Sequence, residues 1–273
     1  MITEQEMLEA LHFYDIDESF LPRCVEAAKT VDPARFDELY KIYYEDALSA
    51  VRQFYGKSVP EIFGENCSPF ITNVMILAGY RLHQKNLEKW QLDPDQLKEN
   101  MWQVQASFVN EVTTRGLPGS RLDYLNWATR FVRMMIIQVG RLKYEVNDDG
   151  WISIHIPRRK GFDIADIRKS IEDSRAILKK MYGLENPPYR CSSWLLSNQV
   201  YALIPKDSNI ARFHDLFEIE DGKDATEDLL NFVWQTKPGT PITELAEDTS
   251  LQRKIKAELL AGRPILIGRG VLK

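Results

Sequence analysis

The chain has 273 residues, 44% of them hydrophobic and 27% charged, with a formal net charge of −5 at pH 7. This composition is ordinary for a soluble globular protein, and the acidic balance disfavours nucleic acid as a partner. The cysteines Cys24, Cys67 and Cys191 are widely separated and form no paired framework, which favours a reducing, cytoplasmic setting. The acidic N-terminus and the lack of a long apolar run predict neither an export signal nor a membrane anchor.

Residues 1–138 are expected to form a helical domain, because apolar residues recur at steps of three and four. Helix starts are predicted at Thr3, where Glu6 completes a capping box, and at Asp32-Pro33, Ser68-Pro69 and Asp93-Pro94. The apolar pattern predicts one helix from Pro69 to Trp90 and another from about Leu122 to Val139. Their aromatic and methionine stripes are read as core.

At Gly140 the pattern changes to strict alternation, which is typical of strands. Strands are predicted at 142–146 and 152–156 around a hairpin turn at Asn147–Gly150, and a third at 189–196 after a helix that begins at Asp163. The tail predicts a strand at 213–219, two helices and a closing strand at 264–267. Residues 139–273 are therefore expected to form a mixed α/β domain against which the helical domain packs, giving an α+β fold.

The run Arg158-Arg159-Lys160-Gly161 stands between a predicted strand and the start of a helix. Unpaired N–H groups and the positive end of the helix dipole attract phosphate at such a place. Asp163 argues against a phosphate cradle, since a carboxylate cap occupies the same N–H groups and repels an anion. A solvated basic loop is the alternative interpretation.

Four segments resemble a known family: Gly140–Glu145, Ile154–Pro157, Cys191–Leu196 and Asp207–Ile210. They look like bacterial acyltransferase-domain proteins, in which a helical N-acyltransferase domain precedes a half similar to the GNAT (Gcn5-related N-acetyltransferase) fold. The resemblance implies that residues 139–273 are GNAT-like. It also implies acyl-CoA, with acetyl-CoA as the first expectation, as cosubstrate and a small-molecule or peptide amine as acceptor.

Two positions depart from the family pattern. Ser192 stands where the family run usually has histidine, which weakens any assignment of a histidine base on that strand. Residues 158–161 do not match the Gly-x-Gly or Gly-x-Ala turn that binds the CoA pyrophosphate. Contact of CoA with Ile156, Pro157, Arg158, Arg159, Lys160 and Gly161 is therefore expected from position and not from a motif.

Direct acyl transfer needs a base for the amine proton and an acid for the leaving thiolate. His155, which faces away from the isoleucine row, is the candidate base, with a structural histidine beside Trp151 as the alternative. Tyr201 occupies the place in chain order where GNAT enzymes often keep an acid, and a core tyrosine is the alternative. Cys191 and Ser193 share the third strand.

Other classes of function stay open. A cysteine nucleophile at Cys191, assisted by His155 or His214, would make a different enzyme, although a buried free cysteine is the default. Lost catalysis on a retained fold would leave a non-catalytic binding or regulatory protein. The four histidines have no metal-ligand spacing, so we expect no metal.

Overall fold

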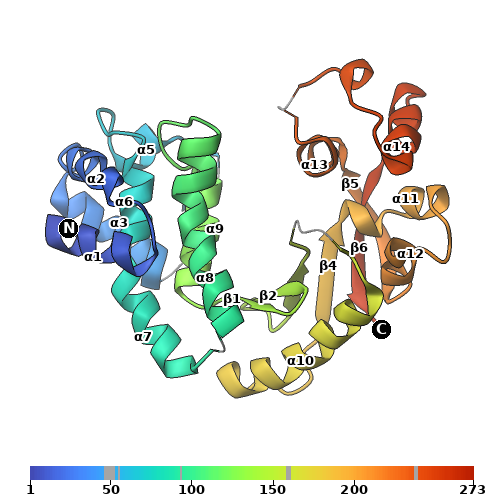
Figure 1. Cartoon of the computed structure of the whole chain (residues 1–273), viewed down its shortest axis with the longest axis horizontal. Helices are drawn as coiled ribbons and strands as arrows, with labels where there is room; N and C mark the ends of the chain where they lie inside the picture. The colour runs from blue at the N-terminus through green and yellow to red at the C-terminus, as the bar shows by residue number, and fades with distance from the viewer. Residues whose placement is uncertain (46–52, 55, 93, 158–160, 237–238) are drawn as a thin grey trace. The chain divides into compact units, whose positions relative to one another are not determined.

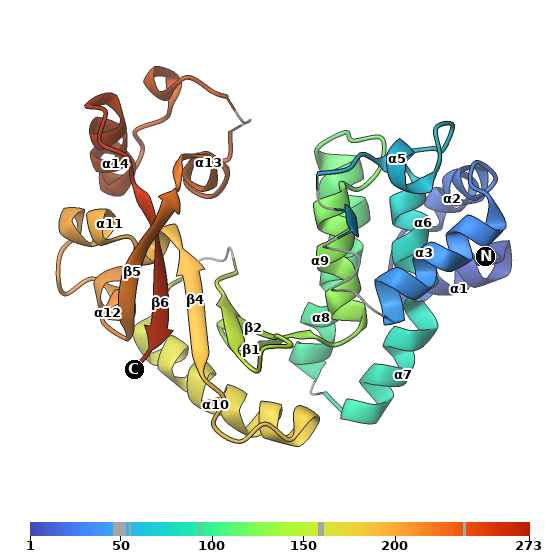
Figure 2. The same ribbon diagram turned by 180° about the vertical axis from the view of Figure 1, so that it is seen from behind.

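The computed structural model describes residues 1–45, 53–54, 56–92, 94–157, 161–236 and 239–273. These residues form two compact units, Met1–Ile137 and Gln138–Lys273 (Figures 1 and 2). A helical unit thus precedes a unit built on a sheet, and the expected α+β class is confirmed. The expected boundary after residue 138 lies one residue from the boundary between the units.

The first unit consists mainly of helices, apart from its last two residues, Ile136 and Ile137, which belong to a strand. Its elements are α1 (Glu4–Phe13), η1 (Glu18–Phe20), α2 (Leu21–Ala28), α3 (Pro33–Glu45), α5 (Val59–Phe63), α6 (Ile71–Ala78), α7 (Tyr80–Trp90), α8 (Pro94–Ala106), the π-helix η2 (Ser107–Thr114) and α9 (Leu122–Val132). The capping box of Thr3 and Glu6 and the start at Pro33 are confirmed. Asp93, the cap expected for α8, lies outside the described residues.

The helix predicted from Pro69 to Trp90 is wrong in two respects. It begins at Ile71, and it is divided at Gly79 into α6 and α7. Tyr44 explains the division, because its hydroxyl donates to the carbonyl oxygens of Met75 (2.8 Å) and Ile76 (3.1 Å). A Cβ on Gly79 would lie 2.5 Å from the Tyr44 ring, so this residue must be glycine for the ring to enter. The periodicity of the sequence does not reveal this contact, because Tyr44 is far from residues 75–79 in the chain.

The helix predicted to reach Val139 is also wrong at its end. It stops at Val132, and the chain turns at Met134, whose φ is 61°. Residues Ile136–Val139 then form strand β1 with all four side chains buried. A short apolar run can fit a helix or a buried strand equally well, so the period alone gave the wrong element.

The core of the first unit surrounds α6, whose residues Ile71–Leu77 are all buried, as expected for a helix that is apolar around its circumference. Near it, the fully buried His83 of α7 accepts or donates a hydrogen bond at Nδ1 with the Tyr14 hydroxyl (3.0 Å). Its Nε2 has no hydrogen-bond partner. Burial therefore lowers the pKa of His83 to about 3.

The second unit is organised by a mixed sheet whose six described strands have the order β1-β2-β3-β4-β6-β5. Its further strands are β2 (Leu142–Val146), β3 (Ile152–His155), β4 (Tyr189–Ser193), β5 (Phe217–Asp224) and β6 (Leu266–Leu272). β3 and β4 are parallel and are joined through α10 (Ile164–Tyr182), whereas β2 with β3, β4 with β6 and β5 with β6 are antiparallel. Figure 2 shows β6 between β4 and β5.

The start of α10 follows the prediction, because the Asp163 carboxylate accepts from the backbone N–H of Ala165 at 2.7 Å. The helix is fixed to the sheet by buried hydroxyl groups. Ser170 Oγ accepts from the Leu142 N–H, bonds the Tyr144 hydroxyl at 2.9 Å and donates to the Val139 carbonyl oxygen. The side chain of Ser170 thus holds β1, β2 and α10 together.

The tail corrects another prediction. Residues 213–219 do not form one strand: α12 (Asn209–His214) ends there, and β5 begins only at Phe217. The remaining elements are η3 (Trp194–Leu196), α11 (Asn198–Leu203), α13 (Thr226–Leu229), η4 (Leu230–Trp234), η5 (Ile242–Glu244) and α14 (Ser250–Leu260). Leu196 lies directly over Gly268 of β6, where an added Cβ would stand 2.0 Å from the Leu196 carbonyl oxygen.

Candidate functional site

The parallel pairing between β3 and β4 stops in the middle of the sheet. Its last partners are Ile154 and Cys191. Beyond them His155 is opposite Lys143 of β2, and Ser192 is opposite Arg269 of β6, so each strand keeps only its outer neighbour. The two strands therefore separate at their carboxyl ends, beside the loop that leads to α10. Beyond Ile154 and Cys191, β3 and β4 are thus no longer paired with each other.

The alternation of side chains assigns the candidate residues to two faces of the sheet. Tyr144, Ile154 and Cys191 are register partners on the face that α10 covers, as the bond from Tyr144 to Ser170 shows. Lys143 and His155 are opposite one another on the other face, together with Glu145. The Glu145 carboxylate and the His155 imidazole thus lie on the same face of the sheet, and His155 is the first residue of β3 without a partner on β4.

His155 is held by a carboxylate that the sequence analysis missed. Its Nε2 lies 2.8 Å from Oε2 of Glu145, whose side chain is 10% exposed against 33% for that of His155. The hairpin turn fixes this neighbourhood, since a register with Val146 opposite Ile152 puts residue 145 beside residue 153 and residue 143 beside residue 155. Counting back from the predicted turn would have found the pair.

Lys143, on the same face, is 6% exposed. Burial lowers the pKa of its ammonium group to about 7. The alternation of Arg141, Lys143 and Glu145 with apolar residues is typical of a half-exposed strand, yet Lys143 and Glu145 are both buried. Charged side chains buried on a sheet face beside a strand opening are a typical sign of a functional site.

A second missed residue, Arg141, fixes both ends of the loop before α10. Its NH1 donates to the carbonyl oxygen of Pro157 at 2.9 Å, and its Nε donates to that of Gly161 at 3.0 Å. The guanidinium also lies 5.5 Å from the centre of the Phe162 ring. Partial burial lowers the pKa of Arg141. The guanidinium thus sets the distance that the loop must span.

The expected cofactor loop is only partly described. Ile156 and Pro157 are half-buried, and Gly161 is exposed with φ of 83°, which favours glycine. Arg158, Arg159 and Lys160 lie outside the described residues. Because Asp163 already accepts from the Ala165 N–H, the helix start itself is satisfied by a carboxylate. This cap agrees with the argument from Asp163 against a phosphate cradle at the helix start.

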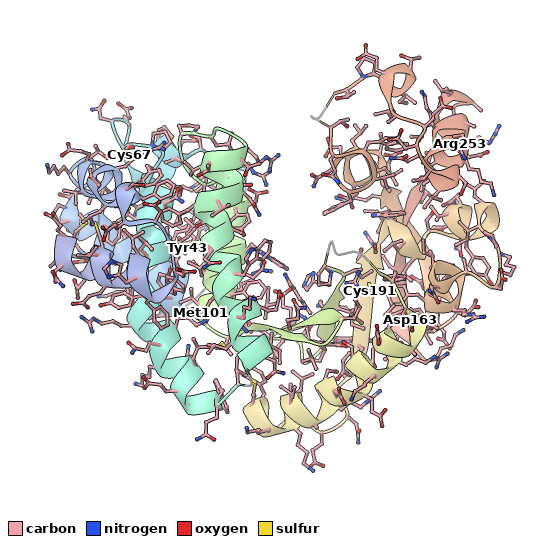
Figure 3. The ribbon with its side chains drawn as sticks, viewed as in Figure 1. Tyr43, Cys67, Met101, Asp163, Cys191 and Arg253 are labelled. Atoms are coloured by element: carbon pink, nitrogen blue, oxygen red, sulfur yellow. The ribbon has the colours of Figure 1, made fainter. Side chains whose placement is uncertain are left out.

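The structure does not bring Cys191 together with a base. Its side chain belongs to the face opposite His155 and is 3% exposed, and burial raises the pKa of its thiol to about 12. Figure 3 shows Cys191 on β4 and Asp163 at the start of α10. Ser193 Oγ accepts from the Leu195 N–H at 3.2 Å and so caps the following turn.

Tyr201 is engaged elsewhere. Its hydroxyl donates to Oδ1 of Asp215 at 2.9 Å, and its ring stacks on His214 with 4.0 Å between the ring centres. Lys206 Nζ lies 3.3 Å from the Tyr201 ring centre. The bond to Asp215 raises the pKa of Tyr201, which makes the phenol a poorer proton donor. These contacts join α11 to α12 and do not include β3.

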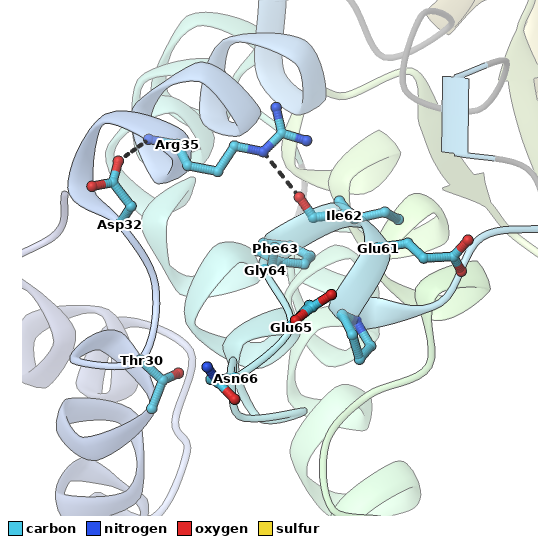
Figure 4. Close-up of a pocket in the computed structure, with 10 residues that line it drawn as sticks. Thr30, Asp32, Arg35, Glu61, Ile62, Phe63, Gly64, Glu65 and Asn66 are labelled. Carbon is cyan, nitrogen blue, oxygen red and sulfur yellow. Dashed lines mark hydrogen bonds between the residues drawn. The ribbon is translucent and has the colours of Figure 1, made fainter.

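A pocket of about 810 Å³ lies in the helical unit (Figure 4). Arg35 and three carboxylates, Asp32, Glu61 and Glu65, are among its lining residues. The Arg35 side chain is committed to the Ile62 carbonyl oxygen and to Glu38. The Thr30 hydroxyl of its lining donates to the Ala27 carbonyl oxygen. The size of the pocket alone does not make it the reaction site.

Two further expectations concern absences. Over the described ranges, no group of three or more His, Cys, Asp or Glu side chains is arranged to hold a metal ion. None of the described helices combines the length and apolar content that crossing a bilayer requires.

Comparison with known proteins agrees with the geometry. The family model for the GNAT-like C-terminal domain matches residues 125–272. No curated protein matches the chain. Among solved structures, an acyltransferase in complex with decanoyl-CoA is 21% identical, with 97% of this chain and 86% of that chain covered and a TM-score of 0.68.

A structure of an acyltransferase in complex with CoA and 10C-teicoplanin is 20% identical, with the same coverage and a TM-score of 0.69. A mutant acyltransferase in complex with octanoyl-CoA, also 20% identical, covers 98% of this chain and 88% of that chain with a TM-score of 0.69. At these identities the likeness shows a shared fold over nearly the whole chain.

Proposed function

Because this chain belongs to the family with the GNAT-like C-terminal domain, we propose that it is an N-acyltransferase that moves an acyl group from acyl-CoA to an amine. The observation that carries the proposal is the end of the β3–β4 pairing at Ile154 and Cys191, with His155, which contacts Glu145 of β2, as the next residue of β3. An opening between parallel strands accepts an extended chain by main-chain hydrogen bonds. The pantetheine arm of CoA is such a chain.

The ligands of the structural neighbours support the choice of substrates. Acyltransferases of the same fold hold decanoyl-CoA, octanoyl-CoA, or CoA together with 10C-teicoplanin. We therefore assign acyl-CoA as the cosubstrate of this chain and a small-molecule or peptide amine as its acceptor. We also assign the reaction to a bacterial cytoplasm: the family resemblance supports a bacterial source, and the free cysteines support a reducing compartment.

The reaction forms one bond and breaks one. The amine nitrogen attacks the thioester carbonyl carbon, the C–N bond forms, and the C–S bond breaks to leave an amide and a thiol. His155 takes the proton from the amine nitrogen, and the same proton is then available for the sulfur, so no further reactant is needed. Unpaired backbone N–H groups at the strand opening can polarise the carbonyl oxygen.

We assign contact with the CoA phosphates to the segment Ile156–Gly161, because it follows β3 in the chain and precedes α10. Arg141 fixes the loop at Pro157 and Gly161. Tyr201 receives no role, because its hydroxyl is directed to Asp215.

The test uses the full chain with decanoyl-CoA or acetyl-CoA. We expect millimolar CoA to raise the melting temperature and a panel of amines to release free thiol from the acyl-CoA. The His155→Gln variant should bind CoA normally and lose about 100-fold or more in kcat, the usual contribution of a general base. The absence of both a thermal shift and thiol release would overturn the proposal in favour of a non-catalytic protein.

A further inference from the structure

We propose that Glu145 is the positioning residue of this site: it fixes His155 in the tautomer that carries its proton on Nε2, so that Nδ1 is the atom that receives the amine proton. The inference rests on the proposed function, since it assumes that His155 is the base. It adds a residue and assigns the reacting nitrogen.

The first step is the chemistry of the contact. An ionised carboxylate only accepts hydrogen bonds, and Oε2 of Glu145 lies 2.8 Å from Nε2 of His155. The imidazole must therefore donate from Nε2. A neutral imidazole has one N–H group, so its lone pair is on Nδ1. A base needs that lone pair, and the carboxylate decides which nitrogen has it.

The second step is the rigidity of the pair. Both residues belong to paired strands and not to loops, with Glu145 opposite Ser153 and His155 opposite Lys143. The Glu145 side chain is 10% exposed, so little water competes for its oxygen atoms. A carboxylate held in this way keeps the ring in one orientation and also stabilises the imidazolium that forms during transfer.

The third step is the position of the pair relative to the opening. His155 is the first residue of β3 that has no partner on β4. The bond to Glu145 comes from β2, on the side away from β4. Nε2 is thus anchored toward β2.

The experiment combines a tautomer measurement with kinetics. The ¹⁵N shifts of the His155 ring should show the Nε2–H tautomer in the unsubstituted protein. In Glu145→Ala and in Glu145→Gln, whose amide can donate as well as accept, the Nδ1–H tautomer should appear. The Gln variant preserves the shape of the side chain, so it serves if the Ala variant folds poorly. The matched control is Glu218→Ala, which deletes an exposed carboxylate on β5 of the same sheet.

For both Glu145 variants we expect kcat to fall at least tenfold with CoA affinity unchanged. In the His155→Gln background, the Glu145→Gln change should lower kcat no further, because its effect passes through the imidazole. A merely structural role would give an added loss in that background. An unchanged tautomer, or full activity in Glu145→Gln, would overturn the inference while leaving the acyltransferase intact. No thiol release by the unsubstituted protein would overturn both.

Discussion

Arg141 donates a hydrogen bond from its guanidinium to the carbonyl oxygen of Pro157 across 2.9 Å. With its second bond, to Gly161, it closes the loop before α10 into a fixed span. The bond to Pro157 joins positions that are 16 residues apart in the chain. Arg141 and Pro157 come from two of the segments that resemble the acyltransferase family.

Arg141→Met should weaken CoA binding about tenfold, because each lost hydrogen bond to a charged donor contributes about 1.5–3 kcal/mol and the loop relaxes in part. Isothermal titration with CoA measures the change. Arg168→Met removes an exposed arginine from α10 and is the control. Equal affinities of the two variants would contradict the role given to the loop.

Ser170→Ala should destabilise the protein by about 1–3 kcal/mol, because a buried donor and acceptor in β2 lose their common partner. Urea unfolding followed by circular dichroism gives the difference. Ser192→Ala, at an exposed position on β4, should change the free energy of unfolding by less than about 0.5 kcal/mol. Similar costs for both changes would show that the hydroxyl network adds nothing.

Cys191→Ala should retain acyl transfer within about threefold, since the thiol is on the α10 face and its raised pKa keeps it protonated. Iodoacetamide at pH 8 should leave Cys191 unlabelled in the folded protein and label it in urea. Loss of turnover in the variant would restore the cysteine nucleophile as a hypothesis.

Stability should fall with pH between about 6.5 and 3 because of His83. The unfolded chain binds a proton at the usual histidine pKa of about 6.5, whereas burial keeps the folded imidazole neutral down to about 3. As the pH falls through this window, His83 alone lowers the free energy of unfolding by up to about 1.4 kcal/mol for each pH unit.

His83→Gln should therefore flatten the acid side of the stability profile, measured by urea titrations at successive pH values. His12→Gln changes an exposed histidine that pairs with Glu18 and should leave the slope as it is. Identical slopes in all three proteins would mean that His83 gains a proton in the folded state.

Gly268→Ala should cost more than about 3 kcal/mol, since the new Cβ would stand 2.0 Å from a backbone oxygen of Leu196 that cannot move without breaking η3. Gly183→Ala, at the end of α10, meets no atom within 4 Å and has φ of 67°, so only about 1 kcal/mol of backbone strain is expected. Thermal unfolding of the two variants compares them directly.

Local signals in the sequence predicted local structure well. Thr3, Asp163 and the Asn147–Gly150 turn act within a few residues, and each is found where the pattern indicated. The break at Gly79 could not be predicted, because its cause, Tyr44, is more than thirty residues away in the chain. The strand Ile136–Val139 was missed because its apolar run fits either period.

In the candidate site too, features within one strand could be predicted, whereas contacts between neighbouring strands could not. His155 was found from the alternation of one strand, and Glu145 was missed because it belongs to the neighbouring strand. Tyr201 was selected from chain order, which does not show where a hydroxyl group points. The faces of Cys191 and His155 follow only from the parallel register of β3 and β4, and that register depends on the crossover through α10.

The place of β6 inside the sheet has a consequence for synthesis on the ribosome. β4 and β5 are not neighbours, and each pairs with β6. Residues 266–272 must therefore leave the exit tunnel before β5 joins the sheet and before β4 gains its second neighbour. The hairpin of β2 and β3 and the crossover to β4 involve shorter separations along the chain and can form earlier. The reaction site would then exist in outline, with the edge of β4 exposed, for as long as translation of the tail continues.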